Sequence, residues 1–231
     1  MINPMFINVA YTIRMLMDSE IRRRIREIME MRVPPGLPIG TVVGYPGSYI
    51  RSGMGVSHHK IMLIRYIITS DLSKGLDVVD AGCGLGWGSY LISANAKTVL
   101  GVDIDARFVK YANEKWVDSN LVFETMDILS RWSFENGSID VVSMMEMIEH
   151  VKVDDLKKCL SEIFRVLKGN GLLIGSSGFT SDPKWKKSML KNPKHLHIYS
   201  SKEFEVLLSD VGFVNPKVYH NWMFIARKPD E

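Results

Sequence analysis

The chain has little cysteine and little net charge, and each shortage excludes a class of protein. Of its 231 residues only Cys83 and Cys159 are cysteines, the first in a glycine-rich stretch and the second in a helical pattern. They do not form a disulfide framework, so we expect a reducing, cytoplasmic setting. A formal net charge of +3 excludes the heavy charge of an obligate nucleic-acid coat, although it allows acidic partners.

Long hydrophobic runs are also missing. The apolar run over residues 61–68 is short and is interrupted by Arg65, and the first residues contain a proline and no leading cluster of positive charge. The sequence therefore predicts neither a membrane span nor a secretory signal. Hydrophobic residues make up 46% and charged residues 24% of the chain, which indicates one ordered globular domain with a short extension.

The first 57 residues are predicted to form that extension, and residues 58–231 the main domain. Residues 17–30 place apolar side chains at helical spacing, and arginines on the other faces favour a solvated surface over phosphate contacts. Prolines and glycines over residues 33–48 break any helix, so we expect a loop there that folds over a pocket.

After residue 76 the pattern predicts an α/β fold with a doubly wound, mostly parallel sheet of seven strands. Short β-branched runs alternate with amphipathic helices, which is typical of parallel strands joined by crossover helices. One predicted helix runs over residues 154–169, with Asp154 as its cap and Gly169 as its stop. The strands are expected over residues 77–82, 98–104, 121–126, 140–145 and 172–177, with a terminal pair over 214–220 and 221–228.

A glycine-rich stretch follows the first of these strands and indicates a cofactor site. Three alternating glycines would let the backbone turn tightly and a ligand approach it. Asp103 ends the next strand, where a carboxylate can bind both hydroxyls of a ribose. The dinucleotide fingerprint is not met, because Trp87 or Ser89 stands where its third glycine is required. A nicotinamide-dependent oxidoreductase therefore remains an alternative only.

Five motifs, in order along residues 60–215, resemble the class I S-adenosylmethionine-dependent methyltransferases, of the type 11 kind. They are "VVDAGCGLGWGS", "VLGVDID", "LVFETMDI", "IDVVSMMEMIEHV" and "RVLKGNGLLIGSS". The resemblance implies a Rossmann-like methyltransferase fold behind the helical extension and S-adenosylmethionine as cofactor. By the same resemblance, Asp103 would bind the ribose, and Met126 and Asp127 the adenine. The methionine part would be held by Asp80, Gly82, Cys83, Gly84 and Gly86.

Acidic residues and a histidine follow the fourth strand. If Glu146, Glu149 and His150 begin a helical turn, they share one face and can ligate magnesium, manganese, iron or zinc. The metal-dependent methyltransferases that this chain resembles add a later histidine, which His195 matches. Without a metal, His150 becomes the general base and Glu149 orients its ring. His58 and His59 are predicted either to line the pocket or to lie on the surface.

The fifth strand is followed by a basic insert with one tryptophan, over residues 181–195. It is predicted to be either a substrate lid that contacts phosphates or an ordinary solvated loop. The chain is most similar to O-methyltransferases of small molecules such as sugars or nucleotide-sugars. RNA 2′-O-methylation is the first alternative, and a catalytically silent binding protein is another. The sequence leaves the oligomeric state open.

Overall fold

The structure, a computed structural model, describes residues 18–31, 37 and 55–230, and only the backbone of residues 55–60. Most of the loop predicted over 33–48 and the side chains of His58 and His59 lie outside the described residues. The predicted boundary between residues 57 and 58 stays a prediction; helix α4 continues across it.

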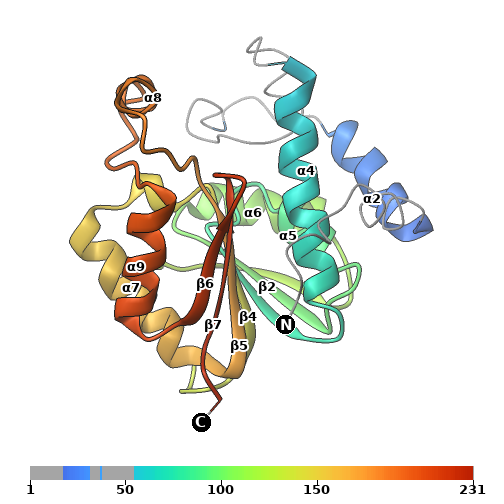
Figure 1. The fold of residues 1–231 in the computed structure, drawn as a ribbon. Coiled ribbons are helices and arrows are strands. Elements are labelled where there is room, and N and C mark those ends of the chain that lie inside the picture. Colours follow the sequence, from blue (N-terminus) through green and yellow to red (C-terminus); the bar gives the residue numbers. More distant parts are fainter. Residues whose placement is uncertain (1–17, 32–36, 38–54, 231) are drawn as a thin grey trace. The chain divides into compact units, whose positions relative to one another are not determined.

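Seven strands form one sheet in the order β3-β2-β1-β4-β5-β7-β6 (Figure 1). β1, β4 and β5 are parallel to one another, whereas β7 runs antiparallel to both β5 and β6. This confirms the predicted doubly wound, mostly parallel sheet. The strands are β1 (Asp77–Ala81), β2 (Thr98–Asp103), β3 (Leu121–Thr125), β4 (Ile139–Met145), β5 (Leu167–Ser176), β6 (Val214–Tyr219) and β7 (Met223–Arg227).

Helices connect these strands, and one short turn follows β4. The helices are α2 (Ser19–Met29), α4 (Gly55–Leu72), α5 (Trp87–Ile92), α6 (Ala106–Lys115), α7 (Val153–Val166), α8 (Pro183–Met189) and α9 (Ser201–Val211). The turn is a 3-10 helix, η2 (Ile148–His150). Among the described residues, no helix is both long and apolar enough to cross a membrane.

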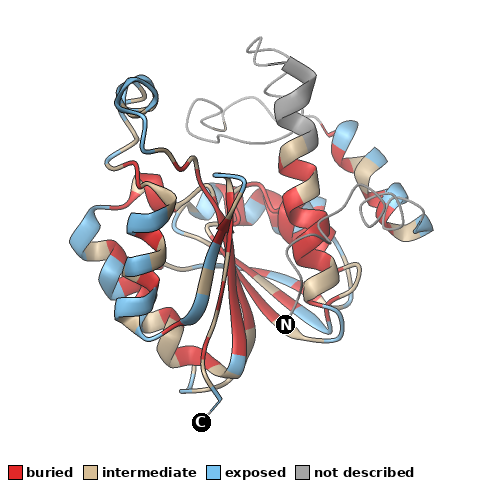
Figure 2. Ribbon diagram, viewed as in Figure 1, coloured by how far each residue is buried: buried red, intermediate tan, exposed pale blue. Residues whose placement is uncertain are grey.

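Backbone contacts divide the chain into two compact units. Described residues within Met1–Leu76, Cys83–Gly101 and Asp105–Thr125 form the first unit, and those within Asp77–Gly82, Val102–Ile104 and Met126–Glu231 form the second. Each unit has its own buried core, shown in red in Figure 2.

In the first unit, α2 is attached through a buried arginine. The Arg24 guanidinium donates hydrogen bonds to the Tyr90 carbonyl and the Ser93 hydroxyl and forms an ion pair with Asp118 at 2.5 Å. It also lies over the Tyr90 ring, which stacks on Trp116 with ring centroids 4.8 Å apart. The basic face predicted as solvated therefore contains one arginine that packs inside.

In the second unit, β4 and β5 are buried along most of their length, as their continuous apolar runs predict. β4 lies between β1 and β5 with Asp80 paired to Ser143 and Ser143 paired to Ile174. Because parallel strands end at the same edge of a sheet, the segments that follow β1 and β4 meet there. α7 and α9 pack side by side in this unit (Figure 1).

The predicted bounds of one helix and of the strand after it were wrong, since β5 begins at Leu167 and not at residue 172. Lys152, and not Asp154, occupies the N-cap position of α7, and Asp154 lies in the first turn. The helix ends at Val166 instead of reaching Gly169. It ends there because Leu167 is already extended and paired with Ile139, so Gly169 lies within β5. The basic insert is not all loop, because Asp182 caps the short helix α8.

Candidate functional site

Gly82 begins the glycine turn, by which we mean residues 82–86. Its φ is +78°, a left-handed conformation that L residues with side chains adopt at a cost, and its N–H donates to the Val102 carbonyl at 2.8 Å. A Cβ atom here would lie 2.6 Å from the Met147 Sδ. Within the second unit, Gly82 therefore packs directly against the segment that follows β4.

The rest of the glycine turn belongs to the first unit. Gly84 and Gly86 also have positive φ values, and a Cβ on Gly86 would lie 2.7 Å from both the Ala112 Cβ and the Phe123 ring. Gly86 is thus required by internal packing as well as by backbone conformation. The Cys83 side chain is buried and does not form a disulfide.

A tryptophan supports the glycine turn from α6. The indole N–H of Trp116 donates a hydrogen bond to the Leu85 carbonyl at 2.8 Å, and Trp116 is buried. Sequence reasoning missed this contact because Trp116 lies 31 residues away and its partner is a backbone atom.

Asp103 and Met126, the predicted ribose and adenine residues, meet through their backbones. The Met126 N–H donates to the Asp103 carbonyl at 3.0 Å. The Asp127 carboxylate accepts hydrogen bonds from the Leu129 N–H at 2.9 Å and the Ser130 hydroxyl at 3.2 Å, so it caps a turn. Asp80 is 1% exposed at the end of β1. The binding roles of these residues stay predictions.

The acidic segment after β4 is not one helical turn. Glu146 has a left-handed φ of +52°, and its N–H donates to the Ser176 carbonyl at 2.9 Å, which extends the β4–β5 pairing. Its carboxylate accepts a hydrogen bond from the Ser176 hydroxyl at 2.8 Å. The helical turn η2 starts only at Ile148 and contains Glu149 and His150. The premise that Glu146 shares a helical face with them was therefore wrong.

Three of the four predicted metal ligands nevertheless converge. Glu149, His150 and His195 each offer one ligand atom, and these atoms all lie within 4.8 Å of one another. Glu149 is 3% exposed, and the rings of His150 and His195 meet edge to face with centroids 5.1 Å apart. We call these three residues the histidine cluster.

Both rings of the histidine cluster are held by backbone carbonyls. Nδ1 of His150 lies 3.0 Å from the Lys194 oxygen, and Nδ1 of His195 lies 2.9 Å from the Met189 oxygen. A carbonyl only accepts hydrogen bonds, so each Nδ1 carries a proton and each Nε2 keeps a lone pair when the ring is neutral. Metal-binding histidines are commonly oriented in this way.

Burial favours the neutral form of the His150 imidazole. Desolvation is the largest influence on His150 and lowers the pKa of its imidazolium, while the hydrogen bond to the Lys194 carbonyl opposes this shift. Desolvation, followed by the charge of Lys186, also lowers the pKa of His197. A neutral His150 can act as a ligand or as a base near neutral pH.

The methyltransferase domain model matches residues 79–175. The chain is 32% identical over 139 residues to a Mycobacterium tuberculosis protein named "Probable S-adenosylmethionine-dependent methyltransferase", covering 60% of this chain and 49% of that one. The chain thus spans about half the length of this relative. It is 26% identical over 148 residues to phosphoethanolamine N-methyltransferase 1 of Triticum aestivum, covering 62% of this chain and 29% of that one.

The fold is shared with solved methyltransferase structures. The crystal structure of an S-adenosylmethionine-dependent methyltransferase from Archaeoglobus fulgidus aligns with a TM-score of 0.58 and 18% identity, covering 71% of this chain and 94% of that chain. At this identity the likeness establishes the fold, and the predicted Rossmann-like methyltransferase architecture is confirmed.

Proposed function

We propose, from the match of residues 79–175 to the methyltransferase domain model, that the chain transfers a methyl group from S-adenosylmethionine to an oxygen of a small molecule. The acceptor class that we propose is a sugar or a nucleotide-sugar. The observation that carries the proposal is the histidine cluster: Glu149 and His150 follow β4, the strand paired with β1, and His195 converges with them.

The residues around β1 fit the cofactor. Gly82 has no room for a side chain and takes a conformation that favours glycine, as expected where backbone must approach a ligand. Asp80 is the last but one residue of β1 and Asp103 the last residue of β2, positions suited to the methionine amino group and the ribose hydroxyls. When bound, S-adenosylmethionine supplies a methyl group on a sulfonium that an oxygen displaces directly. The chain has to align the two reactants, a contribution of roughly 7–11 kcal/mol.

The histidine cluster would remove the acceptor proton. A sugar hydroxyl holds its proton tightly at neutral pH, so an acceptor of this kind needs such help more than an amine does. As the acceptor oxygen bonds to the methyl carbon and the carbon–sulfur bond breaks, releasing S-adenosylhomocysteine, Nε2 of His150 would take the hydroxyl proton.

The same three residues fit a divalent cation. Two imidazoles and one carboxylate, with each Nδ1 held by a carbonyl, form a donor set that suits zinc, iron or manganese better than magnesium. When bound, such a cation supplies Lewis acidity for deprotonation of the acceptor. The Glu146 carboxylate accepts a hydrogen bond from Ser176 and lies outside this group of three, but its charge acts on His150.

Transfer of labelled methyl from S-adenosylmethionine into a cytoplasmic extract tests the proposal. Label in small molecules, carried on oxygen, supports it; loss of transfer with a chelator and recovery with zinc, iron or manganese supports the cation. Chelator-resistant transfer leaves His150 as the base. Label in RNA, or on nitrogen as in the name of the wheat relative, overturns the acceptor class. Stabilisation by NAD⁺ in place of S-adenosylhomocysteine would indicate the oxidoreductase alternative.

A further inference from the structure

The segment after β5 concentrates positive charge. Residues 182–197, which we call the lysine segment, contain one carboxylate, Asp182, and that carboxylate caps α8. α8 buries no side chain and is coloured mainly as exposed in Figure 2. Trp185 is 65% exposed. The lysines of the segment are Lys184, Lys186, Lys187, Lys191 and Lys194.

The lysine segment is joined to the histidine cluster by its backbone. The Leu196 N–H donates to the Glu149 carbonyl at 2.7 Å, and the His197 N–H reaches the same oxygen at 3.4 Å. In return, the segment supplies the Met189 and Lys194 carbonyls that hold the two histidine rings. The backbone that carries the lysines is therefore hydrogen-bonded to the histidine cluster at residues 189, 194, 196 and 197.

Two of the five lysines differ from the others in exposure. Lys186 and Lys194 are half-buried, whereas the other three are exposed. Lys186 lies close enough to the His197 ring for its charge to act there, and Lys194 precedes His195. Lys186 also acts on Glu203, but that carboxylate is held in the capping box of α9 by Ser200.

We propose that the methyl acceptor carries a phosphate group and that Lys186 and Lys194 bind it. The inference rests on the proposed function, whose acceptor hydroxyl lies at the histidine cluster. Lys186 and Lys194 are half-buried residues on the segment that holds the histidine rings, and their charges act on His197 and His150, respectively. An anion is favoured beside these two positive charges, and lysine binds phosphate as a compact point charge. A phosphate would then anchor the acceptor on the lysine segment while its hydroxyl is aligned for transfer.

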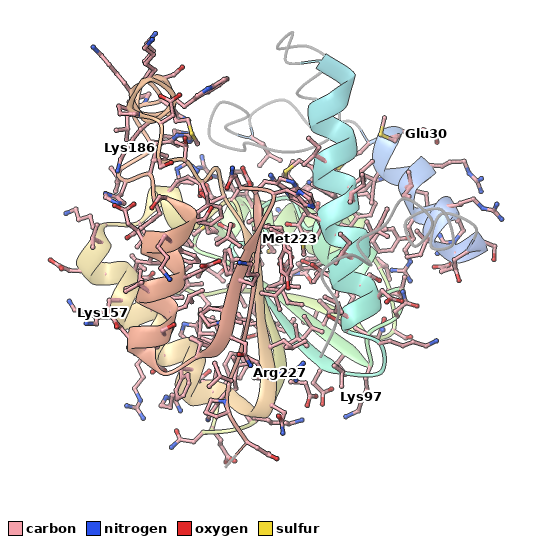
Figure 3. The ribbon with its side chains drawn as sticks, viewed as in Figure 1. Glu30, Lys97, Lys157, Lys186, Met223 and Arg227 are labelled. Carbon is pink, nitrogen blue, oxygen red and sulfur yellow. The ribbon has the colours of Figure 1, made fainter. Side chains whose placement is uncertain are left out.

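Calorimetry on the full chain with S-adenosylhomocysteine present tests this inference. The ligands are glucose 6-phosphate, UDP-glucose and glucose, so that a phosphomonoester, a nucleotide-sugar and a neutral sugar are compared. The variant is Lys186→Gln with Lys194→Gln. Its matched control is Lys157→Gln with Lys158→Gln on α7, which removes the same charge from an exposed surface; Figure 3 labels Lys157 and Lys186.

We expect the wild type to bind one or both phosphate-bearing sugars, more weakly as salt rises, and to bind glucose at least about tenfold more weakly. The Lys186/Lys194 variant should lose about tenfold or more of the phosphate-sugar affinity, and the control should change by less than about twofold. Equal losses in both variants, or equal binding of glucose, overturn the inference. Lysine-dependent binding of an RNA oligonucleotide without binding of either phosphate-sugar replaces it with a nucleic-acid acceptor.

Cofactor binding separates this inference from the proposed function. If the wild type does not bind S-adenosylhomocysteine, the proposed function fails. If it does, and both lysine variants bind S-adenosylhomocysteine equally well, a change in sugar binding reports on the lysine segment alone.

Discussion

The glycine turn and the histidine cluster are built in opposite ways. The glycine turn is five consecutive residues, and what it requires is a backbone conformation and space at Gly82 and Gly86. The histidine cluster joins two neighbouring residues of η2 to His195, which lies 45 residues after His150. Its rings are held by carbonyls of a segment from beyond the next strand.

If the proposed roles hold, this difference separates the residues that bind the cofactor from those that act on the acceptor. A change of backbone or volume should damage the glycine turn, whereas a change of one functional group should damage the histidine cluster. Matched pairs of variants test whether the two parts fail independently.

Replacing the His150 ring should have the largest effect. His150→Asn removes Nε2, so methyl transfer should fall by about 10²- to 10⁴-fold while S-adenosylhomocysteine affinity changes by less than about twofold. The control is His220→Asn, an exposed histidine whose left-handed φ of +50° suits asparagine. Rates and affinities are measured with the acceptor fraction from the labelling assay. Equal rates for the two variants would remove His150 from the chemistry.

Adding one methyl group to the glycine turn should come next. Gly82→Ala should lower the free energy of unfolding by about 2–4 kcal/mol, because backbone strain adds to the clash with the Met147 sulfur. Gly137→Ala is the control, since its φ is +62° and nothing lies within 4 Å of its Cβ position, so about 1–2 kcal/mol of strain remains. Urea denaturation measures both. Equal losses would show that the Met147 contact contributes nothing.

Trp116→Phe should destabilise the glycine turn, because it removes a hydrogen bond to the Leu85 carbonyl. It leaves the buried Leu85 carbonyl without its indole donor, which costs about 1–3 kcal/mol of stability, and it should weaken S-adenosylhomocysteine binding several-fold. Trp132→Phe is the control, because its indole donates to the Ile128 carbonyl at 3.1 Å in the second unit. A similar stability loss with unchanged affinity is expected there. Unchanged affinity in both variants would reduce Trp116 to a packing residue.

The smallest expected effect is the contribution of Glu20, in α2, to the free energy of unfolding. Hydrogen bonds from Arg23, partly opposed by desolvation, lower the pKa of Glu20 from 4.5 to about 2. The folded-state pKa is depressed, so Glu20 contributes stability that is complete above pH 4.5 and is lost as the pH falls toward about 2. Its side chain is 40% exposed, so less than about 1 kcal/mol is expected. The difference in unfolding free energy between wild type and Glu20→Gln should shrink over this pH range; a constant difference would contradict the prediction.

Much of the fold could be predicted because short apolar runs in the sequence indicate the buried strands. The valines of β1 and β4 are buried, and the bounds of these two strands were predicted to within one residue. The end of α7 could not be predicted, because pairing of Leu167 with Ile139 overrides the glycine signal at Gly169. α8 buries no side chain and so lacks helical periodicity, although Asp182 before a proline is a start signal that could have indicated it.

The candidate site divides in the same way. The residue types of the histidine cluster could be read from the sequence. The left-handed backbone of Glu146 could not be predicted, because it accompanies a hydrogen bond to Ser176 on β5. The carbonyls of Met189 and Lys194 could not be predicted either, since every residue has a carbonyl and only the fold decides which one meets a histidine.

That the rings are held by main-chain oxygens has a consequence for which atoms of the lysine segment can be changed. A carbonyl is retained whatever side chain its residue carries, so the lysine segment can exchange its charged or aromatic groups while the two imidazoles keep their orientation. The orientation of the histidine rings and the chemistry of the surface around them therefore depend on different atoms of the same residues. A library that varies the side chains of residues 184–194 while leaving the backbone intact would exploit this separation.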